Sequence, residues 1–254
     1  MERHIKKLNT LISTIFLCIT LLGCNNSIEE KQTDIIENLD SNTIVFEGLI
    51  YKIIDIEGKQ WLDRNLGASE ACADYKVDKE CWGDLYQWGR MADGHEKRDS
   101  SVTYQTANSV QPNHGDFIMV KNKTDDIQKF TNLILNANWT NKLDIKLWQP
   151  NTKVNNVCPI GWRIPTVEEF RALNLKNAED AFFKIKLSLN GTRIGINRYL
   201  LDGKVEGPGF SGEYWTSSID KTYTHIRTLE LEQKQVFIGS SPRINGNAVR
   251  CIKD

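Results

Sequence analysis

Cys158 stands where a cysteine can do chemistry, directly before a segment that has the pattern of a helix start. Residues 158–173 read CPIGWRIPTVEEFRAL, and Thr166 followed three residues later by Glu169 is the signature of a capping box. A helix N-terminus lowers the pKa of a nearby thiol and makes it reactive. A cysteine at this position is equally suited to anchoring a disulfide. The residue types therefore leave two alternatives, a reactive thiol and a structural one.

A second stretch, residues 93–99 with the sequence DGHEKRD, nearly matches the zinc motif H-E-x-x-H. Asp99 stands where the second histidine should be, and Gly94 disfavours a helix that would present two ligands on one face. The remaining histidines outside the N-terminal segment, His114 and His225, are distant from it in sequence. We therefore expect a solvated loop at 93–99, no metal site and no cofactor. The chain also lacks the G-x-S-x-G motif of serine hydrolases, and we do not expect an enzyme.

Cys24 ends a motif near the N-terminus. Three basic residues precede the apolar run 11–22, which is too short for a membrane span of about 20 residues but typical of a signal peptide. The run ends in Leu-Leu-Gly-Cys, which resembles the lipobox of bacterial lipoproteins. The resemblance implies cleavage after residue 23 and lipid on Cys24, which would make the membrane a partner. The alternative is an ordinary signal peptide without lipid.

The composition is that of an ordinary globular protein. The chain has 254 residues, is 40% hydrophobic and 26% charged, and carries a formal net charge of -1. Nucleic-acid binders normally present a basic field, so this balance predicts no nucleic-acid partner. Residues 24–42 are polar and acidic and are predicted to form a flexible tether, with the folded domain at 43–254. Within the domain, residues 91–157 are polar and rich in asparagine.

Four cysteines remain once Cys18 and Cys24 are assigned to the signal and the lipid: Cys72, Cys81, Cys158 and Cys251. An even number in an exported protein favours disulfides, and four cysteines allow three pairings. One of these pairings joins the two that lie nine residues apart and then joins Cys158 to Cys251. A metal site is the rival interpretation, but the chain has no C-x-x-C spacing.

The elements needed to position these residues follow a strand–helix–strand order. β-branched and aromatic residues from Thr43 onward, with a turn at Glu57-Gly58, predict strands and a hairpin. Helices are predicted after Thr166, at 178–187 and within 124–135, where the rest of 91–157 is expected to be a long loop. The last 65 or so residues again have strand character, so we predict an α+β fold with antiparallel sheets, two main helices and a long insertion.

Five segments in this order resemble one family. They are GLIYKIIDIEGKQWLDRNL, GDLYQWGR, CPIGWRIPTVEEFRAL, GEYWTSS and AVRCIKD, and they are similar to the Fibrobacter succinogenes major paralogous domain of exported proteins from gut and rumen bacteria. The resemblance covers about residues 46–254 and departs from the family at 91–157. It implies a fold related to C-type lectins and formylglycine-generating enzymes, with a cysteine beside the second helix bridged to one on the last strand. In this chain those are Cys158 and Cys251, and Trp162 and Trp215 are expected in the core.

The related enzymes hold copper with a nearby pair of cysteines in their C-terminal part, where this chain offers Cys251 alone. Calcium-dependent lectins use Glu-Pro-Asn or Gln-Pro-Asp turns, and the Gln-Pro-Asn tripeptides at 111–113 and 149–151 both precede Cys158, ahead of the loop that should carry the sugar site. We therefore expect neither activity. The resemblance places any ligand surface on the loop at about 190–213, whose candidate binding residues are Arg193, Asn197, Tyr199, Asp202 and Glu206. The alternative for that loop is a solvated hairpin.

Taken together, these features predict a lipid-anchored, non-catalytic binding module of the cell envelope, in the outer membrane and with surface exposure as a further expectation. Its ligand is expected to be carbohydrate or a surface protein. The alternatives are an assembly component that docks a partner through 91–157, and a binding protein diversified by a retroelement.

Overall fold

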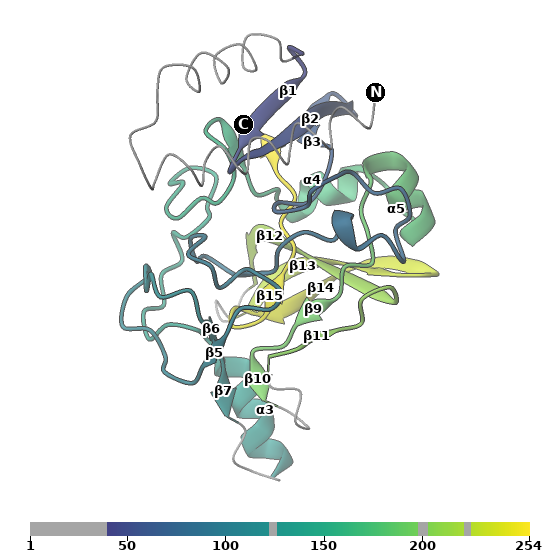
Figure 1. Ribbon diagram of the computed structural model, residues 1–254. Coiled ribbons are helices and arrows are strands. Elements are labelled where there is room, and N and C mark those ends of the chain that lie inside the picture. The colour runs from purple at the N-terminus through teal and green to yellow at the C-terminus, as the bar shows by residue number, and fades with distance from the viewer. Residues whose placement is uncertain (1–39, 122–125, 198–202, 221–224) are drawn as a thin grey trace, which may run out of the picture. The chain divides into compact units, whose positions relative to one another are not determined.

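The computed structural model describes residues 40–121, 126–197, 203–220 and 225–254, although the side chains of residues 130, 135 and 197 are not described. The chain divides into two compact units, Met1–Ile54 and Asp55–Asp254, which are considered separately (Figure 1). Strands dominate, with 33% of residues in strands and 13% in helices, and the sheets are mostly antiparallel. The predicted α+β class is confirmed at this level. No helix within the described ranges is both long and apolar enough to cross a membrane.

The first unit contains an antiparallel strand pair. β1 (Thr43–Phe46) pairs with β2 (Leu49–Ile56), and β2 runs past the end of the unit. In the turn between them, Glu47 and Gly48 have positive φ values of 49° and 76°. Gly48 adopts this conformation at little energetic cost because glycine has no Cβ. The strand predicted from Thr43 onward is confirmed. The signal peptide, Cys24 and most of the predicted tether lie outside the described residues.

In the second unit, a small antiparallel sheet brings the C-terminus to the start of the unit. β16 (Ile252–Lys253) lies between β3 (Lys59–Leu62) and β8 (Trp162–Arg163). Because Cys251 directly precedes β16 and Cys158 lies just ahead of β8, the pairing of these strands brings the two cysteines together, and they form a disulfide. The second disulfide joins Cys72 to Cys81 around the short 3-10 helix η1 (Lys79–Cys81). Both expected pairings are thus present.

Two further antiparallel sheets form the centre of the second unit. The first has the order β11-β9-β15-β4, from the strands β11 (Val205–Glu206), β9 (Thr192–Arg193), β15 (Gly246–Asn247) and β4 (Tyr86–Gln87). The second is a three-stranded meander of β12 (Ser211–Ile219), β13 (His225–Glu232) and β14 (Gln235–Pro242). These strands confirm the β-rich C-terminal part.

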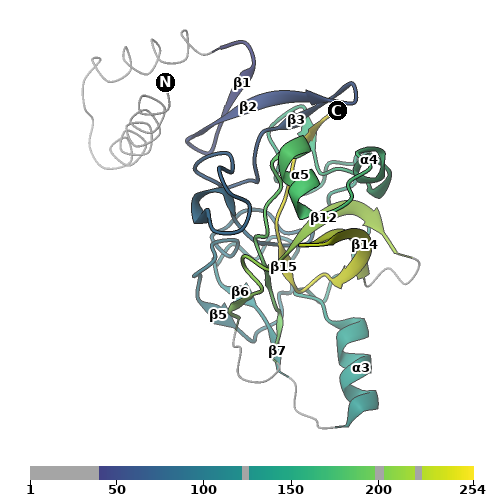
Figure 2. The ribbon, with the colours of Figure 1, turned by 90° about the vertical axis from the view of Figure 1, so that its right-hand side faces the viewer.

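Capped helices lie where the sequence predicts them. α4 (Val167–Ala172) begins at a complete capping box, because the Thr166 side chain accepts from the Glu169 N–H and the Glu169 side chain accepts from the Thr166 N–H. The helix α5 (Ala178–Ile185) is capped by Asn177. The third helix, α3 (Ile127–Asn136), begins at Asp126 and lies at the opposite end of the unit from α4 and α5 (Figure 2).

The segment 91–157 is more ordered than the loop that the sequence predicts. Besides α3 it contributes short strands that pair in parallel, namely β5 (Val102–Thr103) with β6 (Phe117–Ile118), and β7 (Val120–Lys121) with β10 (Ile196–Asn197). Trp139 and Trp148 are buried in it, and the indole N–H of Trp139 donates to the carbonyl of Trp88. Large apolar side chains, spaced too irregularly to show a period, therefore give this segment a core.

Aromatic and arginine side chains fill the interior of the second unit. Trp162 and Trp215 are buried as expected, and the indole N–H of Trp215 donates to the carbonyl of Tyr86 at 2.6 Å. Arg250, next to Cys251, is also fully buried. Its guanidinium donates to the carbonyls of Ile185 and Lys186 at the C-terminal end of α5, where a cation is electrostatically favoured. This contact fixes α5 against the last strand.

Candidate functional site

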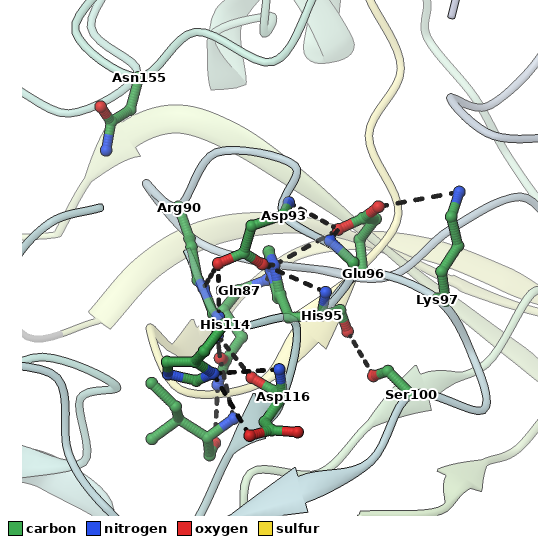
Figure 3. A network of polar contacts seen from close by, with 12 residues as sticks. Gln87, Arg90, Asp93, His95, Glu96, Lys97, Ser100, His114, Asp116 and Asn155 are labelled. Atoms are coloured by element: carbon green, nitrogen blue, oxygen red, sulfur yellow. Dashed lines mark hydrogen bonds and ion pairs between the residues drawn. The ribbon is translucent and has the colours of Figure 1, made fainter. Parts of the chain in front are cut away.

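Residues 93–96 form a buried polar cluster. This corrects the expectation of a solvated loop at 93–99, because His95 is fully buried and Glu96 is only 4% exposed. One potential ligand atom from each of Asp93, His95 and Glu96 lies within 4.8 Å of the others, which is the kind of spacing that could hold a metal ion. Figure 3 shows the cluster with its neighbours. The hydrogen bonds of these three side chains decide whether their ligand atoms are free to bind a metal ion.

Both ring nitrogens of His95 are engaged by the protein itself. The backbone N–H of Gln87 donates to Nε2 at 3.1 Å, so Nε2 must carry the lone pair and Nδ1 the proton. Nδ1 then donates to Oδ1 of Asp93 at 2.7 Å. Burial, and secondarily the charge of Arg90, lower the pKa of His95 to about 4 against the opposing bond to Asp93. The ring is neutral at pH 7 and has no lone pair left for a metal ion or for a substrate proton.

Asp93 joins the histidine to a buried arginine. Its Oδ2 accepts from Nε and Nη2 of Arg90 at 3.1 and 2.7 Å. Burial opposes ionisation of Asp93, but the bonds and charges of His95 and Arg90 outweigh it and hold the pKa of Asp93 well below its usual range. The Nη1 of Arg90 donates to the side-chain oxygen of Gln87 and to the backbone carbonyl of Asp116, both at 2.9 Å. The cluster is therefore a closed network that supports Asp116.

Gly94 and Gly115 allow residues 93–96 and 114–116 to approach each other closely. Gly94 has a φ of 105°, and a Cβ there would lie 3.3 Å from the Cα of Gly115. In this turn the Glu96 carboxylate accepts from the backbone N–H groups of Asp93 and Gly94. The close approach therefore places the rigid 93–96 turn directly beside residues 114–116.

A pocket of about 400 Å³ opens on the side of residues 103–116. That volume is within the usual range for small-molecule sites. Its lining side chains mostly carry hydroxyl, amide, imidazole or carboxylate groups, although apolar atoms make up nearly half of the pocket surface. They belong to Thr103, Gln105, Thr106, Ala107, Asn108, Ser109, Gln111, Pro112, His114 and Asp116. All ten residues belong to the 91–157 segment.

Local hydrogen bonds hold the pocket wall in place. The hydroxyls of Thr103 and Ser109 accept from the backbone N–H two residues further on, so each closes a small side-chain turn. The side-chain amide of Gln111 donates to Asn155, whose own amide donates to the carbonyls of Gly89 and Val110. These hydrogen bonds connect the pocket wall to the buried backbone at Gly89.

His114 and Asp116 stand at the junction of the pocket and the buried network (Figure 3). The backbone N–H of Asp116 donates to Nδ1 of His114 at 3.1 Å, so Nε2 is the ring nitrogen that carries a proton. The Asp116 carboxylate accepts a short hydrogen bond from the Ser101 hydroxyl. A donor and an anionic acceptor are thus available side by side.

The predicted binding residues at 190–213 occupy varied positions. Arg193 is 2% exposed, and its guanidinium donates to the carbonyl of Lys97 and to the hydroxyl of Ser100 while lying 4.2 Å from the centre of the Phe117 ring. Asn197 lies in β10 and Glu206 lies half-buried in β11. Tyr199 and Asp202 fall outside the described residues. The ligand role of these residues stays a prediction, and burial disfavours it for Arg193.

The pocket itself was missed by sequence reasoning. The signal that points to it is QPNHGD at 111–116, a run of turn formers with an imidazole and a carboxylate. Gln111 and Pro112 of the first Gln-Pro-Asn tripeptide do line the pocket, although that tripeptide is misplaced for a lectin calcium site.

A carboxylate pair lies on the central meander. Glu213 on β12 is directly opposite Glu230 on β13. Burial, and next the charge of Glu230, raise the pKa of Glu213 to about 7 against the hydrogen bonds from Ser241 and Asn247. Two carboxylates this close do not both ionise readily, so the pair holds a proton near neutral pH.

Comparison with known protein families, with curated proteins and with solved structures finds no match for this chain.

Proposed function

We propose that the protein is a lipid-anchored, non-catalytic binding module of the bacterial cell envelope, an outer-membrane lipoprotein that binds carbohydrate. The observation that carries this proposal is the polar pocket at residues 103–116. Saccharide recognition needs hydroxyl, amide and carboxylate groups held at fixed positions, and the pocket wall is built from such groups with local hydrogen bonds. Loops fixed on a rigid scaffold commonly carry binding sites.

Two further observations support a binding module. Both nitrogens of His95 are occupied, so the metal-like cluster beside the pocket acts as a scaffold. The mostly antiparallel sheets, the helices α4 and α5 and the bridge between Cys158 and Cys251 agree with the proposed C-type-lectin-like fold and with the Fibrobacter-type family. The lipid on Cys24 and the envelope location are proposed on the motif before Cys24 alone.

A glycan array probed with the full-length protein in a mild detergent tests the proposal. We expect binding to a restricted set of glycans, equal in the presence of calcium and of a chelator. The control is the same protein after reduction and heat unfolding, which should bind none of them. A folded protein with intact disulfides that bound no glycan would contradict the carbohydrate assignment, and binding lost on chelation would contradict the calcium-independent mode.

An assembly component is the second candidate, because the 91–157 segment also exposes apolar side chains. Leu143 is 56% exposed and Ile145 is 47% exposed, and they are two residues apart. Exposed apolar side chains are candidates for protein contacts where they form a patch. Cross-linking in intact cells would then yield a discrete complex that the double substitution L143S/I145S abolishes, while glycan binding stays unchanged.

A further inference from the structure

The charge of the pocket is set by one residue. Among its ten lining residues there is one carboxylate, on Asp116, and there is no lysine or arginine. The side chain of Asp116 is 36% exposed, so its charge reaches the pocket instead of being sealed in the core. An anionic ligand would therefore meet repulsion at the pocket wall.

The nearest guanidinium does not offset that charge for a ligand. Arg90 is fully buried and donates to Asp93, to the side chain of Gln87 and to the backbone carbonyl of Asp116. Because this guanidinium is buried and bonded within the protein, it holds the backbone of Asp116 in place and does not contact a ligand. An acidic ligand would find no cation among the described lining residues.

The hydrogen-bonding groups suit alcohols. The Asp116 carboxylate accepts, and the His114 ring presents Nε2–H as a donor because its Nδ1 already accepts from the Asp116 N–H. A sugar hydroxyl both donates and accepts, so it can bridge an acceptor and a donor that lie side by side. The hydroxyls of Thr106 and Ser109 and the amide of Asn108 extend the same chemistry along the pocket.

We infer that the 103–116 pocket takes a neutral saccharide whose hydroxyls bond to Asp116 and His114, and that Asp116 discriminates against sialylated, uronic-acid and sulfated sugars. This inference rests on the proposed carbohydrate function and adds the ligand class and the two residues that contact it. It separates the site from the 190–213 loop, where the family resemblance would put it. Asp116 is then the residue that determines specificity.

The test uses the full-length protein in detergent and pairs of array glycans, each pair being a neutral oligosaccharide and the same core capped with sialic acid, glucuronic acid or sulfate. We expect the wild type to bind neutral members at least tenfold more tightly than their capped partners. Asp116→Asn should weaken the binding of neutral oligosaccharides about tenfold, since hydrogen bonds to a charged group are the stronger ones. It should also reduce the difference in affinity between neutral and capped glycans. Asp55→Asn, the same charge change at an exposed residue outside the pocket, should change neither.

Thr106→Trp provides a second variant that does not depend on the stability of Asp116→Asn. Thr106 is an exposed residue of the pocket wall, so an indole there would fill the pocket without disturbing the core. We expect it to abolish glycan binding with an unchanged melting temperature. Capped glycans bound as tightly as neutral ones, or glycan binding that survives both variants, would overturn the inference and leave the proposed function standing. No glycan binding by the folded wild type would overturn both.

Discussion

At the scale of single residues, burial decides the protonation of two titratable side chains, and neighbouring charges and hydrogen bonds modify its effect. His95 stays neutral mainly because burial lowers its pKa, whereas Glu213 tends to keep its proton mainly because burial, and next the charge of Glu230, raise its pKa. The first residue resists protonation and the second resists ionisation. Their effects on stability therefore have opposite dependence on pH.

His95 should destabilise the fold as the pH falls from about 6.5 towards 4. Its pKa is lowered to about 4 in the folded state, so between those pH values the unfolded chain binds a proton that the folded protein does not. A difference of this size corresponds to about 3 kcal/mol of unfolding free energy. Urea midpoints measured across that range should fall for the wild type and much less for His95→Gln, whose amide can keep both hydrogen bonds. If the urea midpoints of both proteins fell equally with pH, His95 would not be the source of the pH dependence.

Glu213 should have the reverse effect at higher pH. Its pKa is raised to about 7, so the folded state binds the proton more tightly, and stability is lost as the pH rises from about 4.5 through 7. Glu213→Gln should raise the melting temperature at pH 8, as followed by circular dichroism. It should also weaken the dependence of the melting temperature on pH between about 4.5 and 7. The matched change Glu179→Gln, at an exposed position of α5, should leave the dependence of the melting temperature on pH intact. A pH dependence that persisted in Glu213→Gln would exclude the pair as its source.

At the scale of elements, short helices are held by their ends. α4 has 6 residues, too few to be stable on its own, and its capping box satisfies N–H groups at the first turn. Glu169 of that box also forms a 2.6 Å ion pair with Arg163 on β8, so the cap joins the helix to the small C-terminal sheet. The cap was readable from the sequence because all its members are local. The ion pair to Arg163 depends on how the strand is placed.

Thr166→Ala should lower the unfolding free energy by about 1 kcal/mol, the usual cost of losing such a cap. The Thr166 hydroxyl accepts from the Glu169 N–H at 3.3 Å, and alanine cannot replace it. Denaturant unfolding at neutral pH measures the change. Thr106→Ala, the same substitution at an exposed loop residue, serves as control and should be within error of the wild type. A neutral Thr166→Ala would mean that packing alone holds α4.

At the scale of the whole molecule, covalent links brace the second unit unequally. Cys72 and Cys81 are 9 residues apart, whereas Cys158 and Cys251 are 93 apart. In the chain-entropy description the longer loop restricts the unfolded chain more, by about 4.7 against about 2.7 kcal/mol. The long link also joins the strands β8 and β16 that close the small sheet.

Removing the long disulfide as C158A/C251A should therefore cost about 2 kcal/mol more than removing the short one as C72A/C81A. Urea unfolding of both double variants without reductant measures the difference. The short-loop variant is the matched control, since both changes delete two sulfur atoms. A larger loss from C72A/C81A would show that local packing around η1, and not chain entropy, dominates.

Cys24→Ala should release the protein from the membrane if the lipobox assignment is correct. Diacylated anchors hold a protein stably where one chain would not. Labelling cells with an alkynyl fatty acid and fractionating them measures both acylation and location. We expect the label and the membrane association to disappear together in Cys24→Ala, and to persist in Cys18→Ala. Unlabelled wild-type protein would leave an ordinary signal peptide as the correct interpretation.

The sequence by itself determined the local features of this protein. The capping box at Thr166, the helix after Asp126 and the strand content depend on neighbours in the chain, which periodicity and composition report. The burial of Trp162 and Trp215 was expected from the family resemblance. Of the three cysteine pairings it left open, the structure contains the one that the family resemblance implied.

Only the tertiary structure decided the candidate site. Nothing local marks His95 as buried, because its partner Gln87 and the crossing at Gly115 come from separate segments. The same is true of the pocket, whose wall is tied to Gly89 through Asn155, 66 residues away. Hydrogen bonds between distant segments have no period in sequence, so a polar stretch that looks solvated becomes a buried scaffold only once the chain has folded.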